Sequence, residues 1–192
     1  GSQTVFEILS DAVKDIIEGE LEQLRFNRDH TITKTQYLSI IGAKTARLFS
    51  VSCQLGGLIS EGNYNDMDAL CAYGHHLGMT FQIMDDLADY NTDSKIKSTG
   101  QDIASGVVTL PFIFAYADVN DADKIQMAEL IKAPSTTIND IMPFIQKTQA
   151  INKCLQEANT AVDLAIESLA NISDSPYKDA LIKLAKSLLP TS

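Results

Sequence analysis

The chain has 192 residues, a formal net charge of −10 and 45% apolar residues, so it is long enough and apolar enough to bury one core. The acidic balance and the lack of a basic cluster speak against nucleic-acid binding. No apolar run reaches the roughly 18 residues that a membrane span needs, and no signal peptide is visible, which favours a cytoplasmic protein without an integral membrane segment.

Apolar residues recur every three or four positions along most of the chain, and no long stretch alternates as a strand does. This periodicity predicts an all-α fold of about eight helices. The first helix is expected over residues 5–21. The second begins at Thr33, where Gln36 completes a capping box, and extends over residues 33–60. A third long helix follows a polar turn, with Asn65 or Asp66 as its cap and its end near Tyr90.

A polar stretch at residues 91–105 is the longest region without helical periodicity. Loops of about 15 residues in compact domains are usually functional or disordered. A helix then resumes near Thr109, with Pro111 tolerated in its first turn. Ser175 and Pro176 mark the start of the last helix, as its cap and first helical residue. The remaining helices are expected at roughly 121–132, 136–148, 150–171 and 176–189.

Three aspartates stand in the third predicted helix, within the segment FQIMDDLADY at residues 81–90. Because each residue turns a helix by about 100°, Asp85, Asp86 and Asp89 share one side. Their mutual repulsion and the unfavourable end of the helix dipole cost stability unless a cation lies between them. Mg²⁺ prefers such oxygen ligands and completes its shell with water and substrate phosphates. The aspartate pattern alone fits a solvated acidic face equally well.

Lysines lie on both sides of the aspartates in the sequence. Lys97 follows them closely, just before Gly100, and Lys44 lies on the second predicted helix among small and apolar residues. Ammonium groups that face a metal ion across phosphate oxygens suit a diphosphate-binding site. Taken alone, Lys44 is more simply explained as a surface lysine whose amine reaches solvent.

These segments together resemble the motifs of the trans-isoprenyl diphosphate synthases, or polyprenyl synthetases. FQIMDDLADY is similar to the family's second aspartate-rich motif, FQxxDDxxDY. GELEQ, KTARL, KSTGQDI and GVVTLP resemble the family's GExxQ, KTAxL, GKxxGxDL and GxxTLP, and they occupy residues 19–23, 44–48, 97–103 and 106–111. The motifs stand in the family's order and together cover about residues 18–117.

The resemblance implies an isoprenoid synthase-type helical bundle with prenyltransferase activity. An allylic diphosphate would lose its diphosphate with the help of Mg²⁺, and the carbocation would add to isopentenyl diphosphate. Metal ions and lysines would stabilise the leaving group, and apolar helices would keep water from the cation. Val107, in GVVTLP, resembles long-chain members and favours a medium- or long-chain polyprenyl diphosphate product. The resemblance also implies a homodimer or heterodimer.

The resemblance assigns roles to individual residues. The carboxylates on the metal side correspond to Asp85, Asp86 and Asp89, with Asp85 the first choice for direct ligation. The catalytic and substrate-binding positions correspond to Lys44, Thr45, Gln82 and Lys97. In the family's pattern the two lysines hold the allylic diphosphate, and the other two side chains place oxygens near the carbocation. Asp102 corresponds to a support for the loop or for metal-bound water. A hydrogen-bonded core glutamine is the alternative for Gln82.

One part of the family's pattern has no counterpart. The first aspartate-rich motif, with its arginines, belongs before GExxQ, where this chain has only acids spaced along an amphipathic helix. Residues 3–192 therefore correspond to the C-terminal part of a polyprenyl synthetase domain, without its N-terminal helices. Gly1-Ser2 resembles a cloning remnant, which favours truncation over a natural half-protein. We expect little or no prenyltransferase activity from this chain alone.

Three other functions compete with this interpretation. A class I terpene cyclase shares the fold, but it usually replaces the second DDxxD and lacks KTAxL and GxDL. A non-catalytic partner subunit of a heteromeric prenyl diphosphate synthase is the main alternative, although such subunits commonly lose the aspartates that this chain keeps. An α-helical interaction domain without a ligand is the third.

Overall fold

The computed structural model describes residues 3–60, 62–91 and 99–190, and all the regular structure within these ranges is helical, which confirms the all-α prediction. The first half contains α1 (Gln3–Arg25), α2 (Lys34–Ile41), the π-helical turn η1 (Gly42–Ala46), α3 (Arg47–Ile59) and α4 (Tyr64–Asp89). The second half contains α5 (Gln101–Ser105), α6 (Leu110–Asp118), α7 (Asp121–Lys132), α8 (Ile138–Lys147), α9 (Ala150–Ser168) and α10 (Pro176–Ser187). Within the described ranges, no helix is both long and apolar enough to cross a lipid bilayer.

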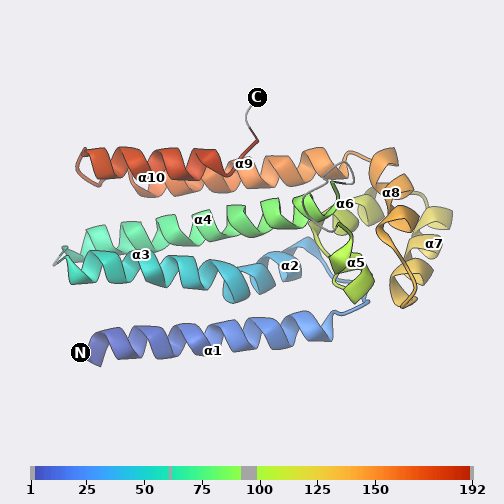
Figure 1. Ribbon diagram of the computed structural model, residues 1–192, viewed down its shortest axis with the longest axis horizontal. Helices are drawn as coiled ribbons and strands as arrows, with labels where there is room; N and C mark the ends of the chain where they lie inside the picture. Colours follow the sequence, from blue (N-terminus) through green and yellow to red (C-terminus); the bar gives the residue numbers. More distant parts are fainter. Residues whose placement is uncertain (1–2, 61, 92–98, 191–192) are drawn as a thin grey trace.

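The long helices lie side by side along the long axis of the molecule (Figure 1). Helix α4 packs between α3 and α9, and α1 covers η1 and α3 on the far side. The short helices α5 to α8 gather at one end, where α4 finishes. The aspartate-bearing end of α4 therefore lies at the junction between the long bundle and this short-helix group.

Polar caps fix several helix ends as the sequence predicts. The capping box of Thr33 and Gln36 is formed at the start of α2. Ser175 caps α10 by accepting a hydrogen bond from the backbone of Lys178. Helix α4 differs from the prediction, because its cap is Asn63 and not Asn65 or Asp66. The Asn63 side chain accepts from the Asp66 backbone, which is the N3 contact that an N-cap makes.

The predicted helix at residues 33–60 is interrupted by the π turn η1. The backbone N–H of Arg47 reaches the carbonyl of Gly42, five residues back, so one extra residue is inserted into the turn. Such single-turn π bulges often occur at functional sites, because they displace side chains from the regular helical spacing. Here the bulge holds Lys44 and Thr45.

Two glycines of α4 allow it to lie unusually close to η1 and α3. A Cβ atom on Gly74 would come within 2.5 Å of the carbonyl oxygen of Phe49. On Gly78 it would come within 2.6 Å of the Cα of Ala46, the last residue of η1. Gln82 lies one turn beyond Gly78, so this backbone contact brings its side chain beside the π turn.

The expected irregular stretch at residues 91–105 contains the short helix α5. Left-handed glycines flank it, with φ of 79° at Gly100 and 80° at Gly106, where residues with a Cβ are disfavoured. The backbone N–H of Gly100 donates to the carbonyl of Asp89 and ties α5 to the end of α4.

Candidate functional site

Lys44 is held by two side chains of α1. Its Nζ donates to Oε1 of Gln23 at 2.6 Å and lies 3.1 Å from a carboxylate oxygen of Glu20. The helices can approach because Gly19 has no side chain, and a Cβ there would come within 2.8 Å of the Lys44 backbone nitrogen. Glu20 and Gln23 carry no role in the sequence prediction, although their spacing of three within GELEQ places them on one face of the helix.

A continuous chain of hydrogen bonds runs from the π turn into the core. Thr45 Oγ1 donates to Gln82 Oε1 at 2.7 Å, and Gln82 Nε2 donates to Asp86 Oδ1 at 2.7 Å. Tyr37 Oη donates to the other oxygen, Asp86 Oδ2, at 2.6 Å. Side-chain hydrogen bonds thereby link α4 to both α2 and η1. Sequence reasoning missed Tyr37, because nothing in its local pattern distinguishes it from other core tyrosines.

Asp86 is a buried carboxyl group, with 4% of its surface exposed. Burial raises the pKa of this group to about 7, against the opposing effect of the hydrogen bonds from Tyr37 and Gln82. Burial and the neighbouring Asp86 also hold the pKa of the Tyr37 hydroxyl well above its usual value. Both Asp86 oxygens accept from protein side chains, so this aspartate is turned toward the core.

Asp89 is turned toward α5. Its Oδ1 accepts from the backbone N–H of Gln101 at 3.1 Å, and its Oδ2 accepts from that of Asp102 at 3.0 Å. These are the first two residues of α5, so Asp89 satisfies N–H groups that a helix start leaves unpaired. Asp102 is thus joined to the aspartate motif through its main chain.

Asp85 is the exposed member of the three predicted metal carboxylates, whereas Asp86 and Asp89 are buried. Within the described ranges, no three His, Cys, Asp or Glu side chains converge closely enough to hold a metal ion by themselves. An exposed carboxylate still suits Mg²⁺, which needs only one or two carboxylates when a substrate supplies phosphate oxygens. Metal binding by the three aspartates stays a prediction, and Lys97 lies outside the described residues.

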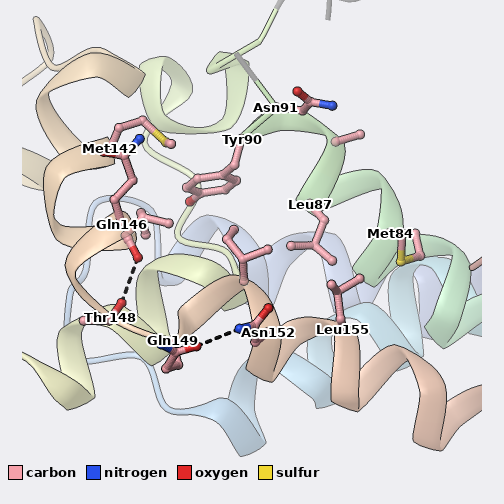
Figure 2. Close-up of a pocket in the computed structure, with 13 residues that line it drawn as sticks. Met84, Leu87, Tyr90, Asn91, Met142, Gln146, Thr148, Gln149, Asn152 and Leu155 are labelled. Carbon is pink, nitrogen blue, oxygen red and sulfur yellow. Dashed lines mark hydrogen bonds between the residues drawn. The ribbon is translucent and has the colours of Figure 1, made fainter. Parts of the chain in front are cut away.

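A separate cavity of about 500 Å³ lies between the end of α4, α8 and the start of α9 (Figure 2). Met84, Leu87 and Leu155 line its apolar part, and the amides of Gln149 and Asn152 bond to each other at its rim. Among the predicted site residues that the structure describes, none lines this cavity. Met84 follows Gln82 by two residues, or about 200° around the helix, so the cavity opens on another face of α4.

A family profile and individual known proteins match the sequence of this chain. The polyprenyl synthetase family profile matches residues 1–148. Octaprenyl diphosphate synthase of Escherichia coli (strain K12) is 35% identical over 193 residues, covering 96% of this chain and 58% of that protein. Heptaprenyl diphosphate synthase component 2 of Bacillus subtilis (strain 168) is 32% identical over 183 residues, covering 93% and 52% respectively.

Solved structures of polyprenyl synthases also superpose closely on this chain. A decaprenyl diphosphate synthase from Rhodobacter capsulatus superposes with a TM-score of 0.92 at 33% identity, over 98% of this chain and 59% of that one. A polyprenyl synthase from Caulobacter crescentus CB15, complexed with calcium and isoprenyl diphosphate, gives 0.90 at 31% identity, over 97% and 58%. The chain therefore spans little more than half the length of these relatives.

Proposed function

Since the chain belongs to the polyprenyl synthetase family, we propose that it forms the part of a polyprenyl diphosphate synthase that binds Mg²⁺ and an allylic diphosphate. The observation that carries this proposal is the meeting of the π turn with α4. It brings an anchored cation, Lys44, and two oxygen-bearing side chains, Thr45 and Gln82, beside the helix that presents Asp85. Relatives named for heptaprenyl, octaprenyl and decaprenyl products support a medium- or long-chain product.

Each of these residues has a chemical task in the proposal. Asp85 would ligate Mg²⁺, with Asp86 and Asp89 shaping its surroundings, and Mg²⁺ shared with the diphosphate would neutralise charge on the leaving group. Lys44 and Lys97 would bind the same diphosphate as ammonium donors. Lys44 is kept in place by Gln23 and Glu20, which lowers the entropic cost of ordering it.

The oxygens beside Lys44 suit a developing carbocation. Gln82 Oε1 accepts one hydrogen bond from Thr45, and an amide oxygen has two lone pairs, so one remains to face positive charge. A fixed oxygen dipole stabilises the cation without reorganising during the reaction. The allylic diphosphate would therefore ionise with its departing group toward Lys44 and Asp85 and its cationic carbon toward Gln82 and Thr45.

In this proposal, the complete prenyl-transfer reaction requires residues that the given chain lacks. The chain covers 58% of the Escherichia coli relative, and the family's first aspartate-rich motif has no counterpart in the given sequence. We expect the given chain to show little prenyltransferase activity alone, and its dimerisation, with a second copy or with another chain, stays a prediction. A non-catalytic partner subunit is the alternative, and a relative named as component 2 of a heptaprenyl diphosphate synthase keeps that alternative relevant. The cytoplasmic location also stays a prediction.

Calorimetric titration tests the proposed site directly. A non-hydrolysable allylic diphosphate analogue should bind in the presence of Mg²⁺, and chelation of Mg²⁺ should abolish the heat. Asp85→Ala should weaken this binding at least tenfold, because it removes the exposed carboxylate. Asp68→Ala is the matched control, an exposed aspartate on the same helix but roughly 25 Å away along its axis. Equal binding by Asp85→Ala and Asp68→Ala would refute the assignment.

A further inference from the structure

We propose that Tyr37 is a positioning residue for the prenyl-transfer site: through Asp86, it fixes the side-chain amide of Gln82 so that its oxygen, and not its nitrogen, faces the cation. This inference rests on the proposed function and extends it to a residue and a carboxyl group in the core. The hydrogen-bond chain from Tyr37 through Asp86 and Gln82 to Thr45 carries it.

The two ends of the Gln82 amide differ in charge. An amide has an oxygen that attracts cations and an NH₂ group that repels them, and the two have nearly the same shape. When ionised, Asp86 can only accept hydrogen bonds, so its Oδ1, at 2.7 Å, draws the NH₂ end of Gln82 toward itself. The oxygen end is then left toward Thr45, whose hydroxyl donates to it. Rotating the amide by 180° would break both contacts.

Asp86 is itself held in one orientation. Its carboxyl group can lock Gln82 only if it does not rotate about its own side-chain bonds. Tyr37 Oη holds the second oxygen at 2.6 Å, so both oxygens are fixed by side chains that come from different helices. Tyr37 is 3% exposed in the core, and its aromatic ring leaves the hydroxyl little freedom to move.

Tyr37 is set apart from the residues that would touch substrate. Thr45 and Gln82 are partly exposed at the site, whereas Tyr37 and Asp86 lie behind them and are buried. Tyr37 is thus two hydrogen bonds removed from the amide oxygen that would face the cation. Loss of its hydroxyl should affect recognition of positive charge and leave diphosphate binding nearly unchanged, because Lys44 has its own anchors on α1.

Tyr37→Phe tests the positioning role without removing the ring. The matched control is Tyr73→Phe, because Tyr73 is an equally buried tyrosine whose hydroxyl donates only to the backbone carbonyl of Leu181. The Gln82 side-chain NH₂ signals, assigned by their loss in Gln82→Glu, are observed by ¹⁵N NMR. In the unsubstituted protein and in Tyr73→Phe these protons should exchange slowly with solvent. In Tyr37→Phe they should shift and exchange at least tenfold faster.

A binding experiment with Mg²⁺ adds a readout that a merely structural role would not move. One probe is an analogue of an allylic diphosphate that bears an ammonium group. The other is the same diphosphate with a neutral carbon in place of the ammonium nitrogen. Tyr37→Phe should reduce the preference for the ammonium analogue at least threefold, while affinity for the isostere stays within twofold. Unchanged Gln82 signals in Tyr37→Phe, or the same change in Tyr73→Phe, would overturn the positioning role. Failure of the unsubstituted protein to bind either diphosphate would instead refute the proposed function, and the NMR result would still decide the role of Tyr37.

Discussion

Asp86 shows how one buried carboxyl group couples the site to pH. Its pKa in the folded protein is raised to about 7, chiefly by burial, whereas an aspartate in an unfolded chain titrates near 3.9. The folded state therefore holds the Asp86 proton more tightly than the unfolded state does. The stability that this group contributes is fully present below about pH 4, and it is lost as the pH rises through about 7.

We therefore expect Asp86→Asn to change how stability depends on pH. Between pH 4.5 and 7.5, in the absence of divalent metal, the free energy of unfolding of the unsubstituted protein should fall relative to that of the variant. The difference should be on the order of 2–4 kcal/mol, because each unit of pKa shift is worth about 1.4 kcal/mol. Urea denaturation at several pH values with a chelator present measures it. Parallel pH profiles for the two proteins would show that Asp86 is not the titrating group.

The site residues were predictable to different degrees. The helical angle between Asp85, Asp86 and Asp89 predicts that they share one side of α4, but it could not show what each faces. Asp86 meets Tyr37, which lies 49 residues earlier in the chain, and that contact depends on how two helices pack. Asp89 meets the start of α5, a helix with no periodic signal of its own. The partnership of Thr45 and Gln82 followed only from the resemblance to known motifs.

At the level of helices, α4 can contact η1 closely because Gly78 has no side chain to separate the two backbones. Gly78→Ala should therefore destabilise the protein by about 1–3 kcal/mol, because the new methyl group would come within 2.6 Å of the Cα of Ala46 and backbone must move. The matched control is Gly56→Ala on α3, where nothing lies within 4 Å of the added atom. That change should be neutral or stabilising by up to about 1 kcal/mol. Urea denaturation of both variants compares them, and equal effects would contradict the packing argument.

Helix boundaries were predicted best where a side chain marks the end. The box at Thr33 and the Ser175 cap were confirmed, because those side chains bond locally to the backbone that follows them. The π turn at residues 42–46 was not predicted, since its local sequence does not mark a bulge and its close packing against Gly19 and Gly78 depends on the fold. Helix α5 was missed because five residues are too short to show periodicity.

For the molecule as a whole, the most unusual surface is on α1. Six apolar residues at spacings of three or four form an outward-facing row, here called the α1 stripe, and their side chains are between 43% and 73% exposed. The stripe consists of Phe6, Leu9, Val13, Ile17, Leu21 and Leu24. It extends roughly 27 Å along a helix whose other side is covered by η1 and α3. Exposed apolar rows of this length usually mark an interface.

We expect this chain to associate with itself through the α1 stripe. Val13→Lys combined with Ile17→Lys should shift the protein toward the monomer, because two ammonium groups at the centre of the stripe cannot be buried without partners. Light scattering coupled to size-exclusion chromatography, over a wide range of protein concentration, measures the molar mass.

Ile125→Lys is the control, because Ile125 is 64% exposed but lies on α7, away from the stripe. Binding of Mg²⁺ and the diphosphate analogue should be unchanged in Ile125→Lys, because Ile125 lies on α7 and is not one of the proposed site residues. The same molar mass for the double variant and the unsubstituted chain would rule out the stripe as the contact between copies.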